Sequence, residues 1–252
     1  MKRFILIVVT MALVFMVGSP VTGQTARAPY RSPENLLQQS DLTRNGWPSF
    51  SNVTEIRNYE DGELKDDGKF EISMKGFSKT LVRFLNPDVK GEYLLMLDDA
   101  MWIYMPNTRK PIRITPLQRL LGDASNGDVA RTHYAEDYTA ASMRDEVLDG
   151  TPCSVLDLTP RRDGATYARI EYWIASETVR PLKAEIYLTS GKHYKTIHYD
   201  KYGTISGRVL LLQMTITDRL REGRTTIMAF SEYAPKDIPE KYFNKDYLEK
   251  LK

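Results

Sequence analysis

The chain has 252 residues, of which 35 are Lys or Arg, 33 are Asp or Glu and one is cysteine. This near-neutral balance, without a run of basic residues, argues against nucleic-acid binding, which needs a face of Lys and Arg to neutralise phosphates. A single cysteine excludes an internal disulfide, so stability must come from an apolar core.

The N-terminal residues predict export from the cytoplasm. Lys2 and Arg3 precede an uncharged apolar stretch over residues 4–17, which is shorter than the roughly 20 residues that an α-helix needs to cross a bilayer. We therefore expect residues 1–23 to be a cleaved signal peptide and residues 24–252 to form one periplasmic domain. Cleavage would remove two basic residues and no acidic one, so the mature chain would be neutral.

Residues 33–42 carry leucines at a helical interval and predict a short helix, after which the hydrophobic pattern changes to period two. Alternation of this kind indicates strands with one buried face, and it occurs in four segments, residues 70–74, 168–174, 182–188 and 210–216. Asp-Gly and related turn signals separate the segments. The pattern predicts a mainly β fold with about ten or eleven antiparallel strands.

Residues 116–140 interrupt this alternation. Pro116 stands at a helix-start position, Leu117, Leu120 and Leu121 follow at helical spacing, and Gly122 is a stop signal, so we expect a short helix followed by polar turns. A long insertion without strands in a β domain usually serves as a lid, a plug or a binding loop. Apolar residues between 242 and 251 predict a short terminal helix.

Charged residues next to the insertion suggest two roles. Arg109, Arg113 and Arg119 lie close together in the sequence, so they could ring the mouth of a cavity and meet a phosphate or an acidic partner, or form a solvated edge. Arg83 lies on an otherwise apolar strand. Because an unpaired buried charge is costly, we expect an ion pair with an acidic residue of the insertion, Asp128 or Asp137.

No motif for nucleophilic, metal-dependent or nucleotide chemistry occurs in the sequence. His193 and His198 are five residues apart, which places them on opposite faces of a strand and disfavours a shared metal ion. His133 lies near Asp128 and Glu136, which could form an acid–base pair or a weak cation site, although helix caps and solvated charges are favoured. We expect no catalysis, no cofactor and no metal.

Residues 83–87 (RFLNP), followed by a strand, an acidic turn and residues 101–106 (MWIYMP), resemble the LolA/LolB-like periplasmic carriers. The longer string from Ile112 to Tyr138 is similar to the branch of that superfamily known as outer-membrane lipoprotein-sorting proteins. This resemblance covers roughly residues 50–235. It implies an incomplete antiparallel β-barrel around an apolar cavity that short helices cover, and loading by an inner-membrane ABC or RND-type exporter.

The residues themselves also favour a cavity. Residues 93–97 and 101–105 are apolar on both faces, so the sheet must curl over one face while other segments cover the second. An acyl chain of about 16 carbons could gain on the order of 10 kcal/mol by filling the enclosed space. The alternative is a closed and packed core. The residues expected to line one connected space beneath residues 116–140 are Ile72, Met74, Ile103, Ile170, Ile186, Leu212 and Met214.

These observations lead to one main functional hypothesis. The protein is expected to be a monomeric carrier of lipid or acylated lipoprotein between the inner and outer membranes, with the insertion filling the empty cavity and moving aside when acyl chains enter. Two alternatives remain: a module that senses lipid or envelope stress and regulates a membrane protein, and a lipid hydrolase built on the same fold.

Overall fold

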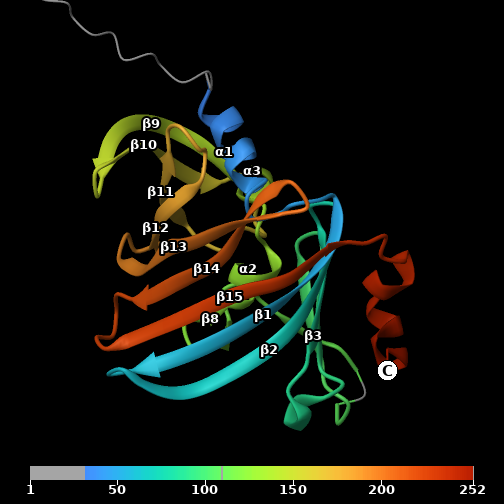
Figure 1. Ribbon diagram of the computed structural model, residues 1–252. Helices are drawn as coiled ribbons and strands as arrows, with labels where there is room; N and C mark the ends of the chain where they lie inside the picture. Colours follow the sequence, from blue (N-terminus) through green and yellow to red (C-terminus); the bar gives the residue numbers. More distant parts are fainter. Residues whose placement is uncertain (1–31, 109, 252) are drawn as a thin grey trace, which may run out of the picture.

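A single curved antiparallel sheet dominates the structure (Figure 1). The computed structural model describes residues 32–108 and 110–251, so the predicted signal peptide and Arg109 lie outside the described residues. The sheet contains 13 strands in the order β6-β5-β4-β3-β2-β1-β15-β14-β13-β12-β11-β10-β9. Because β6 and β9 stand at the two ends of this order and do not pair, the sheet curls without closing.

The bounds of the strands follow the chain. The first half contains β1 (Ser49–Glu60), β2 (Glu63–Lys75), β3 (Lys79–Phe84), β4 (Tyr93–Leu97), β5 (Ala100–Tyr104) and β6 (Ile112–Ile114). The second half contains β9 (Tyr138–Leu148), β10 (Thr151–Pro160), β11 (Arg169–Ala175), β12 (Pro181–Tyr187), β13 (His193–Ile205), β14 (Arg208–Asp218) and β15 (Arg224–Pro235). Pairing of β1 with β15 joins the two halves.

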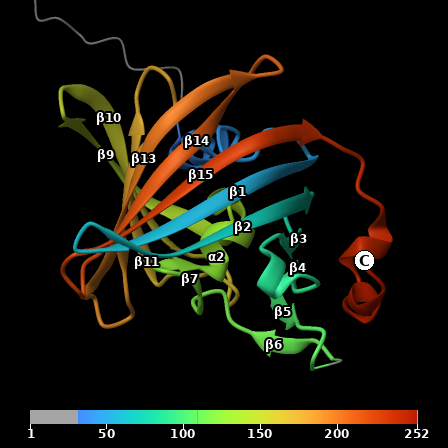
Figure 2. The ribbon, with the colours of Figure 1, turned by 60° about the horizontal axis from the view of Figure 1, so that its bottom comes forward.

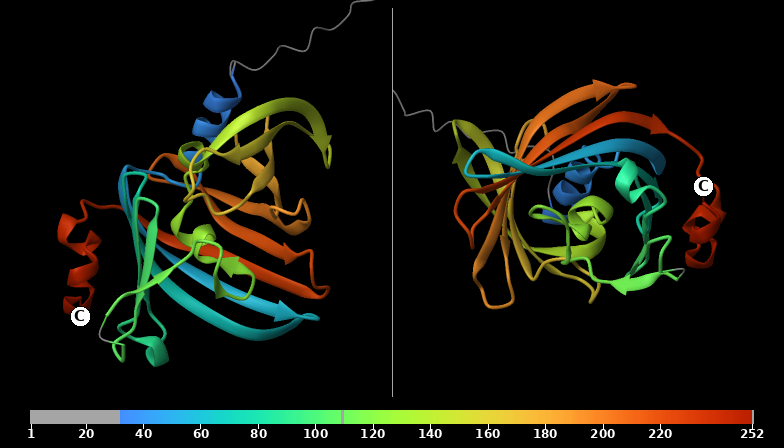
Figure 3. Two further views of the ribbon diagram at one scale, coloured as in Figure 1. Left: turned by 180° about the vertical axis from the view of Figure 1, so that it is seen from behind. Right: turned by 90° about the horizontal axis from the view of Figure 1, so that it is seen from below.

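The chain crosses from one open edge of the sheet to the other through the interior. This crossing contains β7 (Arg119–Leu121), β8 (Ala124–Ser125), α2 (Asn126–Ala130) and α3 (Tyr134–Asp137), and we call residues 119–137 the plug. Figures 2 and 3 show the strands wrapping around α2, which lies inside the curve of the sheet. All five residues of α2 are buried.

Alternation along the strands produces the concave core as the sequence predicts. Phe70, Ile72 and Met74 on β2 are buried, and antiparallel pairing aligns their face with the inward residues of neighbouring strands. Helix α1 (Pro33–Asp41) packs into the same core through Leu36 and Leu37. Its first turn is fixed because the side chain of Ser32 accepts a hydrogen bond from the Asn35 backbone N–H.

The outer face of β3–β5 is covered by the C-terminal segment (Figure 1). Tyr93, Leu95 and Trp102 point to this outer side, where they pack with residues of the 3₁₀ helices η2 (Glu240–Phe243) and η3 (Lys245–Lys250). A third short helix, η1 (Pro87–Val89), lies between β3 and β4. Strands β4 and β5, which are apolar on both faces, are therefore covered on the inner face by the main core and on the outer face by the C-terminal segment. No helix within residues 32–108 and 110–251 is long and apolar enough to span a bilayer.

Three expectations from the sequence need correction. The main sheet has 13 strands, more than the ten or eleven predicted, because a strand of three residues such as β6 is too short to give a periodic signal. Residues 119–121 form a strand instead of a helix, since Gly122 adopts a positive φ of 56° and turns the chain into the β7–β8 hairpin. The C-terminal helix exists, but as 3₁₀ turns.

The contact between the hairpin of the plug and the sheet can be tested at Gly122. A Cβ at this position would lie 2.6 Å from Thr226 Oγ1 on β15, whereas a Cβ at Gly62, where φ is also positive, would meet nothing within 4 Å. We expect Gly62→Ala to cost about 1–2 kcal/mol for the backbone conformation and Gly122→Ala roughly 1–3 kcal/mol more, because of overpacking. Urea unfolding measures both, and equal costs would show that the hairpin does not press on the sheet.

Candidate functional site

Buried ion pairs anchor the plug to the inner side of the sheet. Lys195 on β13 forms an ion pair with Asp128 on α2, and each side chain is only 1% exposed. Asp128 also accepts hydrogen bonds from the Tyr167 hydroxyl at 2.5 Å and from the Ser125 backbone N–H at 2.8 Å, the latter closing a capping box at the start of α2. The predicted helix cap at Asp128 is confirmed, but its carboxylate is buried and not solvated.

A second and a third anchor hold the two ends of the plug. Asp137 of α3 accepts hydrogen bonds from Arg131 at 2.6 Å and from Arg162 at 2.6 Å. Near the hairpin, the buried Asp123 forms ion pairs with three arginines, Arg119, Arg221 and Arg224. Each buried carboxylate is therefore compensated by cations, which removes much of the cost of burying it.

Between these anchors, the plug and the sheet enclose a small apolar chamber. Its volume is about 20 Å³, which is enough for roughly one water molecule. It is lined by Arg44, Phe50, Asn52, Ile72, Met74, Asp128, Val129, Thr132, Leu211, Met214, Phe230 and Tyr233. At this position the plug leaves almost no free space against the sheet.

The seven residues expected to line a ligand space are only partly brought together. Ile72, Met74 and Met214 line the chamber, while Ile170 and Ile186 are fully buried elsewhere in the same core. Ile103 and Leu212 are half-buried and do not line it. That these residues bind a ligand stays a prediction.

The reasons for the two departures are local. Register shifts around Lys201 in the pairing of β13 with β14 move the inward position by one residue, so Leu211 lines the chamber in place of Leu212. Ile103 pairs with Leu94 and shares its inward face, but it lies on β5, beside the open edge, where less of the core covers it.

The predicted arginine group does not form one patch. Arg113 lies on β6 with its guanidinium carbon 5.2 Å from the ring centroid of Trp102, on the outer face, whereas Arg119 pairs with Asp123 and Asp218 at the plug. Arg109 lies outside the described residues.

The ion pair predicted for Arg83 has a different partner. Arg83 pairs with Glu71 on the neighbouring strand at 3.3 Å, and not with Asp128 or Asp137, because the side chain of Arg83 points to the outer face, away from the plug.

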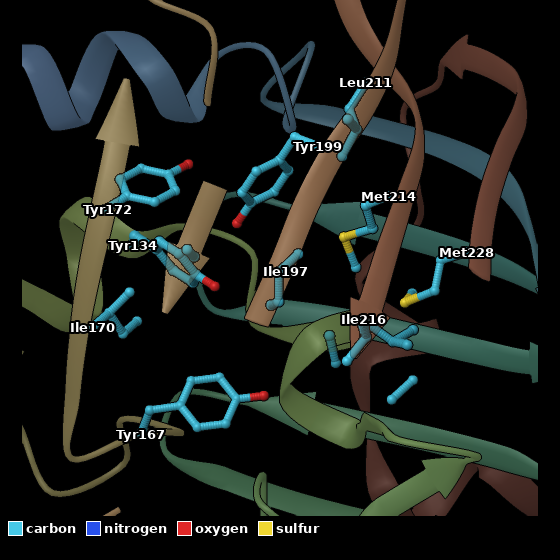
Figure 4. Packing of buried hydrophobic residues seen from close by; sticks show 14 of the residues in the cluster. Tyr134, Tyr167, Ile170, Tyr172, Ile197, Tyr199, Leu211, Met214, Ile216 and Met228 are labelled. Carbon is cyan, nitrogen blue, oxygen red and sulfur yellow. The ribbon is translucent and has the colours of Figure 1, made fainter. Parts of the chain in front are cut away.

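A buried arginine lies among tyrosines, at a position that the sequence did not indicate. Arg44, in the loop after α1, is 7% exposed, and its guanidinium carbon lies 4.2 Å from the ring centroid of Tyr134 and 5.8 Å from that of Tyr199. Tyr172 packs edge-on against both rings. Figure 4 shows the three tyrosines gathered beneath α1, one each from α3, β11 and β13. Tyr172 shares the period of Ile170 and Ile174, so its inward direction was readable, but a loop arginine has no periodic signal.

Asp41 links α1 to the plug. Its Oδ2 accepts a hydrogen bond from the Ala135 backbone N–H at 2.8 Å, in the first turn of α3. Burial raises the pKa of Asp41 to about 7, although Arg44 and the Ala135 N–H oppose this shift.

His133 is neutral at ordinary pH, because burial lowers its pKa to about 4. Its ring packs edge-on against Phe77, with the ring centroids 4.9 Å apart. Within the described ranges no group of three or more His, Cys, Asp or Glu side chains could hold a metal ion.

Comparison with known proteins places this geometry in a family. The structure of a LolA superfamily protein from Nitrosomonas europaea matches with a TM-score of 0.80 and 30% sequence identity, over 85% of this chain and 98% of that one. The chain belongs to the LolA superfamily. The resemblance read from residues 83–87, 101–106 and 112–138 is therefore confirmed.

Other matches agree on the LolA-like fold. A DUF1329 family protein from Desulfovibrio piger is 22% identical with a TM-score of 0.73, over 88% of this chain and 99% of that one. An outer membrane lipoprotein-sorting protein domain from Vibrio parahaemolyticus is 20% identical with a TM-score of 0.71, over 86% and 97%. A family model described as an uncharacterized protein matches residues 76–250, and no curated protein matches the chain.

The raised pKa of Asp41 predicts a pH dependence of stability for this LolA-like fold. Because the folded state holds this proton more tightly than the unfolded state, the contribution is fully present below about pH 4 and is lost as pH rises to about 7. Asp41→Asn mimics the protonated form at every pH. We therefore expect the free energy of unfolding of this variant, compared with that of the parent, to be about 2–4 kcal/mol higher at pH 8 than the same comparison gives at pH 4. Urea unfolding across this range measures it. The exposed control Asp66→Asn should follow the parent, and identical curves for all three proteins would refute the assignment.

Proposed function

We propose that this protein is a periplasmic carrier that binds the acyl chains of a lipid or lipoprotein between its curved sheet and the plug, and moves them between the inner and outer membranes. The observation that carries the proposal is the position of the plug. It is a separate segment lying on the apolar concave wall, so the fold provides a wall that a chain of similar width could occupy in its place.

The proposed mechanism is exchange of one apolar packing for another. An entering chain gains about 0.8 kcal/mol for each buried methylene group, so roughly 16 carbons gain on the order of 10 kcal/mol. That gain offsets the loss of plug packing around the chamber, which Val129 lines together with Ile72 and Met214. Since affinity is the difference between the two packings, release to an acceptor needs no external energy source.

The route of exchange follows from the topology. The edges β6 and β9 share no hydrogen bonds, and the plug is the segment that passes between them. The plug can therefore move outward between the edges without breaking any strand pairing. Flexible thioethers on the wall, at Met74, Met214 and Met228, allow the remaining surface to adapt to different chains.

The family supports a binding role in the envelope. One protein of the same fold is described as an outer membrane lipoprotein-sorting protein domain. Together with the export signal predicted at residues 1–23, this favours transport across the periplasm, with loading by an inner-membrane ABC or RND-type exporter. Binding is favoured over catalysis because the Ser125 hydroxyl is enclosed in the capping box and bonded to Asp128 and Tyr167.

Weakening the plug should strengthen ligand binding if the two compete. Val129 is on the plug and 2% exposed, and Val129→Ala removes part of its packing on the wall. We expect this variant to bind a fluorescent C16 fatty-acyl probe about three- to tenfold more tightly than the parent.

The matched control lies on the sheet. Ile186→Ala should cost about 2–5 kcal/mol in urea unfolding without tightening the probe, because Ile186 is fully buried on β12 and belongs to the wall, not to the plug. If the parent binds no probe, or if both variants change affinity alike, the competition does not exist.

A further inference from the structure

Arg44 is a cation inside the protein without a hydrogen-bonded partner. Its side chain faces the chamber, and its Nη1 is buried with no hydrogen bond within residues 32–108 and 110–251. Five more buried side-chain polar atoms lack a partner in these residues, and three of them belong to neighbours of Arg44: the hydroxyls of Tyr172 and Tyr199 and Oδ1 of Asp41. The rings of both tyrosines belong to the cluster around the guanidinium. Three unpaired donors and one unpaired carboxyl oxygen are thus concentrated around the guanidinium of Arg44.

This arrangement is costly for the empty protein. An enclosed charge requires a counter-charge and hydrogen bonds to replace its hydration. The other enclosed cations near the plug have both, since Arg131 pairs with Asp137 and Lys195 with Asp128. Arg44 has a carboxyl group nearby in Asp41, but the two side chains form neither an ion pair nor a hydrogen bond within the described residues. Arg44 lies over the face of Tyr134, which attracts the charge but accepts none of the five N–H donors in its plane.

We propose that Arg44 binds the anionic head group of the cargo, a carboxylate or a phosphate carried on an acyl chain. This inference rests on the proposed function and specifies its ligand class. A guanidinium matches the oxygens of both acids with paired N–H···O bonds, and the hydroxyls of Tyr172 and Tyr199 can donate to the same oxygens. The acyl chain then extends from Arg44 along the wall at Phe50, Ile72 and Met214, which line the same chamber.

The same contacts couple head-group binding to release of the plug. Tyr134 belongs to α3, so moving the plug outward removes the aromatic face from Arg44 at the moment when the wall becomes free. An anion supplies the missing compensation, whereas a neutral head group does not. The ligand that stabilises the open state most strongly is therefore an anionic amphiphile.

The test compares three ligands that share one saturated C16 chain, hexadecanoate, hexadecyl phosphate and hexadecanol, by displacement of a fluorescent acyl probe from the full mature chain. We expect at least one of the two anions to bind ten or more times as tightly as the alcohol. Arg44→Gln should abolish this preference and leave hexadecanol affinity within about twofold. Arg44→Lys should retain part of it, and Arg208→Gln, which removes an arginine stacked over Trp47 outside the chamber, should retain all of it.

The outcomes separate the two proposals. Equal affinity of the parent for the anions and the alcohol overturns the role of Arg44 but keeps the carrier, while no binding of any C16 ligand overturns both. An equal loss for all three ligands in Arg44→Gln shows a purely structural arginine. If Arg44→Gln does not fold, the parent's preference and its partial retention in Arg44→Lys decide the question. Tighter binding of hexadecyl phosphate than of hexadecanoate by the parent identifies phosphate as the recognised group, and the reverse order identifies a carboxylate.

Discussion

The packing of the plug against the concave wall is the interaction on which the rest of this structure depends. An antiparallel sheet that curls without closing leaves an apolar inner face and two unpaired edges, and both are liabilities in water. Here the chain between β6 and β9 covers the inner face with α2 and spans the gap between the edges. The connection that completes the topology is therefore also the segment that competes with a ligand.

The way in which the plug is held suits exchange. The plug combines apolar packing in the core, by residues such as Val129 and Ala130, with ion pairs such as that of Asp128 with Lys195. Buried ion pairs contribute little net stability compared with apolar packing, but they define one position sharply. A plug held in this way sits in one place and yet can be displaced by a chain that buries more carbon. Asp41 and Arg44 connect the same segment to α1 through Ala135 and Tyr134.

Much of the fold could be predicted from the sequence because strand periodicity is a local property. The inward faces of β2, β11 and β12 follow directly from the alternation of Phe70, Ile170 and Ile186 with polar neighbours. The site was less readable because its decisive features are non-local. A register shift replaced Leu212 by Leu211, a positive φ at Gly122 replaced a helix by a hairpin, and Arg44 became buried only through tyrosines from three distant elements.

Hydrogen exchange of the plug in the presence and absence of hexadecanoate tests the central claim most directly. In the free protein the amides of Asn126, Gly127 and Arg131 are bonded to carbonyl groups of the plug and the segment before it. If the ligand replaces the plug on the wall, protection of these amides falls by about tenfold or more in the complex, while β13 and β14 remain protected. Full protection of the plug in a complex that has bound the chain would contradict the account.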